Sequence, residues 1–311
     1  MTHLEQRLRE RNLRLVNKTL ISGAHAGNVY RIEALHLDGH RSSFIYKEFA
    51  EDRSNEVDIY RVLENYIKPF SKKEALWDSQ PQAILMEDLG NPLKQEFGLS
   101  PFQRKIELIK KILERLAELH SNNFNEITNG IPTHQLTLEW YEWCLSQLKR
   151  LHLEINWAES GWMEIINDAY HQLGLSEYNP RIPLTLTHGD PHLENIFLKD
   201  EEIWLVDWEW AALGSPLRDI TILCQDCYNS NLIQYIYDSY KVLIEKRGVN
   251  VPDEDYKSDF FYLYIDHTTM MLAWEIEKFF QGFATEERIR QIVSFKIGEV
   301  RRVITLETPK L

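Results

Sequence analysis

Three oxygen-bearing side chains, Asp190, Asn195 and Asp207, are spaced as a proton acceptor followed by two metal ligands. Asp190 stands in a short, tight segment, where a carboxylate can accept the proton of a hydroxyl. Asn195 follows five residues later, and Asp207 comes twelve residues after that, at the end of a predicted strand over 203–206. Mg²⁺ in phosphoryl-transfer sites binds one or two carboxylates together with phosphate oxygens. The three residues together predict transfer of a phosphoryl group to a hydroxyl.

The triplet His188-Gly189-Asp190 indicates only a turn when it is taken alone. Its meaning changes because Asn195 lies at the spacing of the asparagine that binds Mg²⁺ in the protein kinase catalytic loop. Asp207 strengthens the interpretation, since a carboxylate leaving its strand toward the same loop is a natural second ligand for Mg²⁺. The combination, rather than the triplet, predicts a catalytic loop.

His188-Gly189-Asp190 with Asn195, followed by Val206-Asp207-Trp208-Glu209, resembles the aminoglycoside phosphotransferase and choline kinase superfamily. Two further segments share the family's pattern: Leu116–His120, ahead of the loop, and Gly214–Asp219, after the metal-binding aspartate. The match runs from about residue 20 to about residue 225. It implies an α+β, two-lobed, protein-kinase-like fold with a small β-rich N-lobe and a larger, mostly helical C-lobe.

The resemblance also implies a role for each residue of the loop. Asp190 would be the catalytic base, and Asn195 and Asp207 would bind Mg²⁺. His188 would orient the loop, and Asp219 would brace it by hydrogen bonds without taking part in the chemistry. His192 also stands where the family commonly has a histidine. A histidine satisfied within the loop and one that contacts the substrate both remain open for it.

The first part of the chain is expected to hold ATP. Lys47 lies on a predicted strand over 42–49, where its amine can pair the α- and β-phosphates of the nucleotide. Glu56 lies on the inward stripe of a predicted helix over 55–67, and by the resemblance it would hold that amine. An isolated strand lysine is otherwise most often a solvated edge charge.

Two backbone segments complete the expected nucleotide site. The segment from Ser22 to Tyr30 would cover the phosphates, with Gly23, Gly27 and Asn28 as its contacting residues, because glycine lets the backbone approach them closely. An ordinary hairpin turn would explain this segment equally well. Glu87 and Leu89, in a hinge over residues 87–92, would give backbone hydrogen bonds to adenine.

The order of predicted elements divides the chain into two lobes. Residues 1–86 contain a helical start that extends to Leu13, followed by strands over 29–37 and 42–49 and one helix, and they form the predicted nucleotide-binding lobe. Residues 87–92 form the hinge, punctuated by a glycine and a proline. Residues 93–311 are mostly helical and form the predicted catalytic and substrate-binding lobe.

Composition excludes several classes of protein. The chain carries 35 basic and 48 acidic residues, a net charge of −13, which argues against broad nucleic-acid binding. Its start lacks the apolar stretch of a signal peptide, and no apolar run is long enough to cross a membrane. We expect a cytoplasmic protein with no membrane partner. The sequence does not determine the oligomeric state.

The acceptor is expected to lie between the loop and the C-terminal helices. Aromatic rings beside carboxylates can hold a cationic amine, and the candidate contacts are Trp208, Glu209, Asp266 and Trp274. The same aromatic residues at helical spacing are more often part of a core. An aminoglycoside, a choline-like amino alcohol, a sugar and an amino-acid derivative all remain open as acceptor, as does the choice between ATP and GTP.

Two other functions compete with a small-molecule kinase. One is a catalytically inactive relative that binds a nucleotide and has a structural or regulatory role. The presence of every predicted site residue argues against it. The other is a protein kinase, and it is disfavoured because Trp208-Glu209 follows Asp207 where D-F-G would stand, with no activation segment ending in A-P-E.

Overall fold

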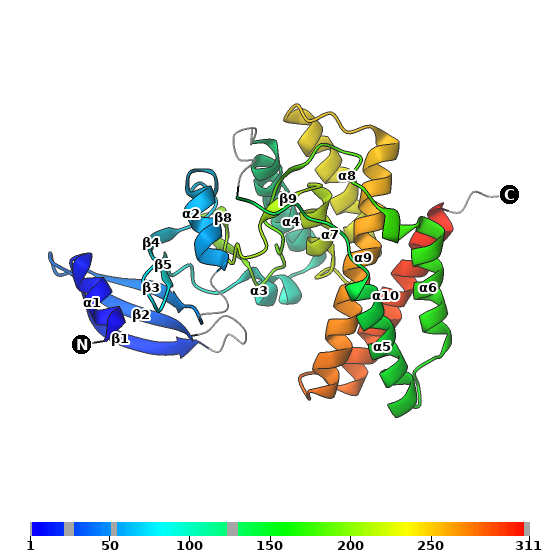
Figure 1. The fold of residues 1–311 in the computed structure, drawn as a ribbon, viewed down its shortest axis with the longest axis horizontal. Coiled ribbons are helices and arrows are strands. Elements are labelled where there is room, and N and C mark those ends of the chain that lie inside the picture. Colours follow the sequence, from blue (N-terminus) through cyan, green and yellow to red (C-terminus); the bar gives the residue numbers. More distant parts are fainter. Residues whose placement is uncertain (1, 22–27, 51–54, 123–129, 308–311) are drawn as a thin grey trace. The chain divides into compact units, whose positions relative to one another are not determined.

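The structure is a computed structural model, and it describes residues 2–21, 28–50, 55–122 and 130–307 (Figure 1). The chain forms two compact units that are not continuous in sequence. The first unit contains Met1–Glu96 and Glu194–Ala211, and the second contains Phe97–Leu193 and Ala212–Leu311. The predicted division into 1–86, 87–92 and 93–311 follows the linear chain and stays a prediction.

The first unit is built on a five-stranded antiparallel sheet in the order β1-β2-β3-β5-β4. Its strands are β1 (Leu13–Ile21), β2 (Asn28–His36), β3 (Arg41–Glu48), β4 (Lys73–Trp77) and β5 (Ala83–Glu87). Helix α1 (His3–Glu10) packs on this sheet and buries Leu4 and Leu8 with Phe44 and Tyr46 (Figure 1). Since side chains alternate along a strand, Lys47 leaves β3 on the face opposite Tyr46.

The start of the sheet corrects one expectation. Leu13 was expected in a helical start, but α1 ends at Glu10 and Leu13 opens strand β1. Asn12 adopts a φ of 60° at the change of direction, a conformation that asparagine tolerates better than most residues. The predicted strands over 29–37 and 42–49 and the helix over 55–67 are confirmed as β2, β3 and α2 (Asn55–Ile67).

A hairpin from the middle of the chain belongs to the first unit. Its strands β7 (Ile196–Lys199) and β8 (Glu202–Leu205) pair with Ile196 opposite Leu205. The Leu205 N–H donates to the carbonyl of Phe70, just beyond α2, at 2.9 Å. The segment that precedes Asp207 is thereby attached to the unit that contains Lys47.

The second unit is mostly helical. Its elements are α4 (Phe102–Ser121), α5 (Glu139–Glu154), α6 (Gly161–Leu173), η1 (Leu175–Glu177), α7 (Leu217–Cys224), α8 (Ser230–Lys246), α9 (Asp253–Phe280) and α10 (Glu286–Glu307), with the short strands β6 (Thr185–Thr187) and β9 (Ala212–Gly214). Helix α3 (Leu93–Leu99) spans the sequence boundary between the units. Helices α5, α6, α9 and α10 lie side by side (Figure 1).

Helix α9 organises this helical layer. It packs against α5, α7 and α10, and most of its middle turns are buried. Because all of its faces are covered, its sequence has no narrow apolar stripe. A β-rich first part and a mostly helical second part confirm the predicted α+β class. None of the described helices combines the length with the apolar character needed to cross a bilayer.

Candidate active site

Lys47, Glu56 and Asp207 meet in the first unit. The Lys47 ammonium donates to Glu56 Oε2 at 2.6 Å and to Asp207 Oδ1 at 3.1 Å. These three residues come from β3, from the first turn of α2 and from the segment after β8. The strand lysine is therefore 5% exposed rather than solvated at an edge. The structure brings together three of the predicted site residues that are widely separated in sequence.

Burial and charge act in opposite directions on this cluster. Burial would lower the pKa of Lys47, but the negative charges of Glu56 and Asp207 outweigh it and raise that pKa, so the amine stays cationic. Burial raises the pKa of Glu56 to about 7, although the Lys47 charge opposes the change. Glu56 Oε1 is buried and has no hydrogen-bond partner among the described residues. The cluster holds a fixed cation that can face a phosphate.

The hairpin brings Asn195 beside Asp207. The register that pairs Ile196 with Leu205 continues for one residue, because the Val206 N–H donates to the Asn195 carbonyl at 3.1 Å. Asp207 follows directly and adopts a φ of 67°, a strained conformation for a non-glycine residue of the kind that often marks functional sites. Its side chain is 35% exposed.

This donor set fits a magnesium ion. An amide oxygen from Asn195 and a carboxylate from Asp207 are hard oxygen ligands, and Mg²⁺ is usually bound by one or two protein groups together with water and phosphate. Among the described residues, no group of three or more histidine, cysteine or acidic side chains forms a complete metal site. The oxygen donors of Asn195 and Asp207 suit a metal ion that nucleotide phosphates also bind.

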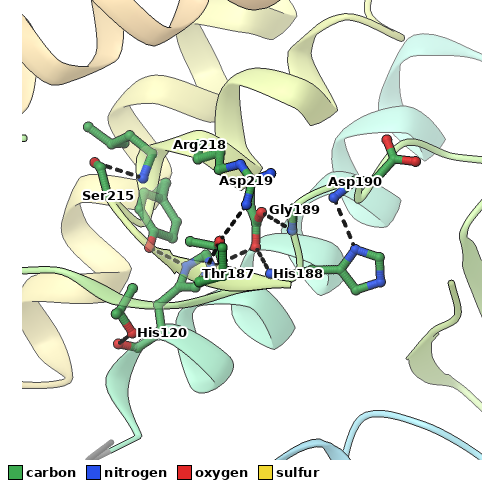
Figure 2. A network of polar contacts seen from close by, with 12 residues as sticks. His120, Thr187, His188, Gly189, Asp190, Ser215, Arg218 and Asp219 are labelled. Atoms are coloured by element: carbon green, nitrogen blue, oxygen red, sulfur yellow. Dashed lines mark hydrogen bonds and ion pairs between the residues drawn. The ribbon is translucent and has the colours of Figure 1, made fainter. Parts of the chain in front are cut away.

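Asp219 holds the backbone of the predicted catalytic loop in the second unit. It is fully buried on α7, and it accepts the N–H groups of His188 at 2.7 Å and of Gly189 at 2.8 Å (Figure 2). Burial would raise its pKa, but the hydrogen bond and charge of His120 with further positive neighbours lower it overall. A carboxylate fixed in this way sets the position of the two residues before Asp190.

Asp190 extends from this braced backbone. Its N–H donates to His188 Nδ1 at 3.2 Å, and its carboxylate lies apart from Asp219 (Figure 2). Gly189 has a φ of 89°, which glycine adopts without the cost that a side chain would add. The His192 imidazole approaches Asp190, with Nε2 at 3.3 Å from Oδ2. The contact with Asp190 leaves both interpretations of His192 open.

Sequence reasoning missed part of the support for this loop. His120, at the end of α4, contacts Asp219 Oδ2 through Nε2 at 3.0 Å and the hydroxyl of Tyr240 on α8 through Nδ1 at 2.6 Å. The motif Leu116–His120 pointed to this helix end without assigning a role to the histidine. Nothing in the spacing of Tyr240 could have indicated it, since the contact joins residues far apart in sequence.

The predicted nucleotide loop and hinge are only partly described. Gly23 and Gly27 lie outside the described residues, whereas Asn28 begins β2 and pairs with Glu48. Glu87 ends β5, and Leu89 follows in a buried position. Their contacts with adenine stay predictions.

The predicted acceptor contacts separate into two groups. Trp208 is fully buried and donates its indole N–H to the Leu205 carbonyl at 3.3 Å, and Asp266 is 2% exposed and accepts the Tyr170 hydroxyl at 3.0 Å. Neither of these two side chains offers surface to an acceptor, and packing accounts for both. Glu209 and Trp274 are partly exposed and remain candidates.

Two surface hollows of the second unit lie outside the predicted catalytic residues. One has a volume of about 430 Å³ and is lined by Tyr178, Arg181 and Tyr262 among others. The other, of about 170 Å³, is lined by residues of α8, α9 and α10, including Tyr237 and Phe261. Neither lining includes a residue of the loop from His188 to Leu193.

The family of the chain follows from comparison with known sequences. A model described as the phosphotransferase enzyme family matches residues 28–240. Protein LicA of Haemophilus influenzae is 33% identical over 54 residues, which are 17% of this chain and 20% of that protein. A LicA homolog of Mycoplasma capricolum is 29% identical over 149 residues, 46% of this chain and 56% of the homolog. The chain thus spans between a fifth and just over half of these relatives.

Solved structures share the fold over nearly the whole chain. The choline kinase LicA of Streptococcus pneumoniae superposes with a TM-score of 0.58 at 14% identity, covering 97% of this chain and all of that one. A spectinomycin phosphotransferase in complex with ADP and spectinomycin superposes with a TM-score of 0.59 at 15% identity, covering 96% and 98%. At these identities the likeness is one of fold. It confirms the predicted protein-kinase-like, two-lobed architecture.

Proposed function

The chain belongs to the phosphotransferase enzyme family, and from this premise we propose that it transfers the γ-phosphoryl group of ATP, with Mg²⁺, to a hydroxyl of a small molecule. The ion pairs that join Lys47 to Glu56 and Asp207 carry this proposal. They place a fixed cation beside a carboxylate that can bind a metal, which is the arrangement that phosphoryl transfer requires. The ADP complex of a structural relative supports a nucleotide as the phosphoryl donor.

Each residue has one part in the proposed reaction. Lys47 holds the phosphates of the nucleotide, and Glu56 keeps the Lys47 amine in place. Asn195 and Asp207 would hold Mg²⁺, which would neutralise negative charge on the phosphate oxygens. Asp190 accepts the proton of the acceptor hydroxyl while the hydroxyl oxygen attacks the γ-phosphorus, and the bond from that phosphorus to the bridging oxygen breaks to release ADP.

We infer that the acceptor is a cationic amino alcohol of the choline type. Trp274 on α9 is partly exposed, and its ring already has the Lys278 ammonium 5.6 Å from its centroid. Trp143 on α5 lies edge-on to Trp274, with the ring centroids 6.1 Å apart. Aromatic faces of this kind attract a quaternary ammonium group. The names of the relatives, which include a choline kinase, agree with this choice.

Replacement of Asp190 tests the proposed base. Asp190→Asn is expected to lower kcat by about 10²- to 10⁴-fold, the range that general base catalysis supplies. Stabilisation by Mg²⁺ and a nucleotide in thermal unfolding should survive, because the phosphate-binding residues are unchanged. Asp238→Asn, at an exposed position of α8, is the matched control. Full turnover in Asp190→Asn would refute the assignment.

A panel of acceptors tests the substrate. ADP release would be measured with choline, ethanolamine, spectinomycin, an aminoglycoside, a macrolide and a sugar. Choline should also be compared with 3,3-dimethyl-1-butanol, a neutral analogue of the same shape. A clear preference for choline over this analogue, lost in Trp274→Leu, is the expected result. A protein that binds ATP and phosphorylates nothing in the panel would instead favour the inactive relative.

A further inference from the structure

Lys199 connects the β7–β8 hairpin to the hinge. It is the last residue of β7, and its ammonium contacts Glu87 Oε1 at 2.5 Å and the Asp88 carbonyl oxygen at 3.0 Å. All three residues belong to the first unit, although more than a hundred positions separate them in sequence. One lysine therefore ties the side chain of one hinge residue and the backbone of the next to a distant hairpin.

The backbone N–H and the side chain of Asp88 are also held by hydrogen bonds, mostly from the sheet. The Asp88 N–H donates to the Ser43 carbonyl at 3.2 Å, and the Asp88 side chain accepts the Ser43 hydroxyl at 2.7 Å. Arg31 Nε on β2 pairs with Asp88 Oδ2 at 2.8 Å, and the Gly90 N–H donates to Asp88 Oδ1 at 3.0 Å. With both its N–H and its carbonyl engaged, this residue cannot rotate without breaking several hydrogen bonds.

We propose that Lys199 is a nucleotide-positioning residue that sets the orientation of the hinge backbone for the base of the nucleotide. The inference rests on the proposed function, because it takes the Glu87 carbonyl and the Leu89 N–H as the groups that meet adenine. The Glu87 carbonyl lies in one peptide plane with the Asp88 N–H, and the Leu89 N–H lies in one with the Asp88 carbonyl. Fixing both groups of Asp88 therefore orients the two groups that meet adenine before the nucleotide arrives. Such preorganisation raises affinity by removing the cost of ordering the site.

The same hairpin carries the proposed metal ligands. Asn195 directly precedes β7, and Asp207 follows β8 by two residues. The base and the phosphates of one nucleotide would thus be positioned by a single element, with Lys199 at the base end. A change at Lys199 should therefore act on recognition of the base and spare recognition of the phosphates.

An ordinary surface ion pair is the competing explanation. The Lys199 and Glu87 side chains are each 32% exposed, and exposed pairs commonly contribute little to stability. The hydrogen bond to the Asp88 carbonyl distinguishes the two explanations, since a pair that only stabilises the surface has no reason to change nucleotide affinity. The decisive measurement is therefore ligand binding.

Lys199→Met tests this inference in the intact chain of 311 residues. We expect the Kd for ATP, measured by titration calorimetry with Mg²⁺, to rise about tenfold, as expected when one charge-assisted hydrogen bond no longer orders the site. The KM for ATP should rise with it, while kcat at saturating ATP stays near the wild-type value. The Kd for inorganic tripolyphosphate, which has no base, should not change. Lys199→Arg should restore most of the affinity for ATP.

Lys73→Met is the matched control. Lys73, on β4 in the same unit, forms an ion pair with Glu64 on α2 at 2.7 Å, whereas Lys199 pairs with a residue of the hinge. The control should bind ATP like the wild type. If Lys199→Met also binds ATP like the wild type, or if tripolyphosphate binding weakens as much as ATP binding, the positioning role is refuted while the proposed function stands. A wild-type chain that binds no nucleotide at all would overturn both.

Discussion

The charge balance around Lys47 decides how the nucleotide end of the site behaves. One buried ammonium faces two carboxylates, of which Glu56 is fully buried and Asp207 is partly exposed. A buried ion pair contributes little net stability, but removal of one partner leaves an uncompensated charge. Glu56 is therefore stabilised by Lys47, while Asp207 remains accessible to a metal ion. Lys47 therefore has two roles: it stabilises the buried Glu56, and it is the proposed cation for the phosphates of the nucleotide.

Lys47→Met separates these two roles through pH. The variant leaves Glu56 buried without its cation, so the pKa of Glu56 should rise further above its ordinary value. Glu56 then binds its proton more tightly in the folded state than in the unfolded state. Stability therefore falls as pH rises from the unfolded pKa of Glu56 to its raised folded pKa. We expect a loss of about 3–5 kcal/mol at pH 8 and a smaller loss at pH 5.5, measured by urea unfolding.

The double variant Lys47→Met/Glu56→Gln is the control for that experiment. It removes the ionisable group, so its stability should be similar at both pH values and should exceed that of Lys47→Met at pH 8. Stabilisation by Mg²⁺ and ATP should be lost in both variants, because neither retains the phosphate-binding cation. An equal loss of stability at pH 5.5 and pH 8 in Lys47→Met would contradict the explanation.

At the scale of elements, the sequence predicted those whose patterns are local. The helix over 55–67 has its apolar stripe within its own sequence, and the strand around Lys47 alternates regularly. Strand β1 was missed because it is an edge strand with mostly exposed side chains: Val16 and Leu20 are exposed, and Leu13 is its one buried residue. Strand β4 is short and was also missed. Periodicity cannot reveal a strand whose only support is the neighbour with which it pairs.

The site residues likewise could be predicted only where the signal is local in sequence. The loop motif and the spacing of Asp207 identified residues that could do chemistry, because motif and spacing are local. Other contacts join segments that are distant in sequence, and no local pattern indicates them. His120 links Asp219 to Tyr240, and Lys199 contacts the hinge. Trp208 and Asp266 were expected to contact the acceptor because their residue types suit a cation, but their burial depends on packing that composition does not record.

The brace between α7 and the catalytic loop leads to a prediction with a close internal control. Asp219→Asn replaces an acceptor-only carboxylate with an amide, so one of the two loop N–H groups loses its partner. That loss should cost about 1–3 kcal/mol of stability. It should also lower kcat, because Asp190 is then held less firmly. The measurements are urea unfolding and steady-state kinetics on the same preparations.

Asp259→Asn is the control for this brace. Asp259 on α9 is also fully buried, and it accepts the N–H groups of Arg181 and Ile182 and the hydroxyl of Ser215, all of which lie outside the loop from His188 to Leu193. Its replacement should lower stability by a similar amount and leave kcat of the folded enzyme unchanged. If both variants lower kcat to the same degree, Asp219 acts on general stability and not on the loop.

At the scale of the whole molecule, the chain passes between its two units at three places along the sequence, after Glu96, Leu193 and Ala211. The second crossing falls within the predicted catalytic loop, between Asp190 and Asn195. A linear division of the sequence cannot anticipate this return, because the hairpin over 196–205 joins the first unit through contacts with Phe70 and the hinge. The proposed base and the proposed metal ligands therefore belong to different units.

The second unit carries a pH dependence of stability that is independent of the proposed chemistry. Burial raises the pKa of Asp266 to about 7, well above the ordinary value of an aspartate, and the hydrogen bond from Tyr170 offsets only part of this rise. The folded protein therefore holds this proton more tightly than the unfolded chain. Between about pH 4 and pH 7 the contribution of Asp266 to stability falls as pH rises, and above pH 7 it levels off.

Asp266→Asn should remove this slope. The amide keeps a carbonyl oxygen for the Tyr170 hydroxyl and never ionises, so the variant should gain stability relative to the wild type as pH rises. The gain at pH 8 should approach about 4 kcal/mol at most, from about 1.4 kcal/mol for each unit of pKa difference. Chemical unfolding across pH 4 to 8 measures it, with Asp168→Asn at an exposed position of α6 as control. If the difference in stability between Asp266→Asn and the wild type is the same at every pH in that range, the pKa of Asp266 is not raised in the folded protein and the explanation is wrong.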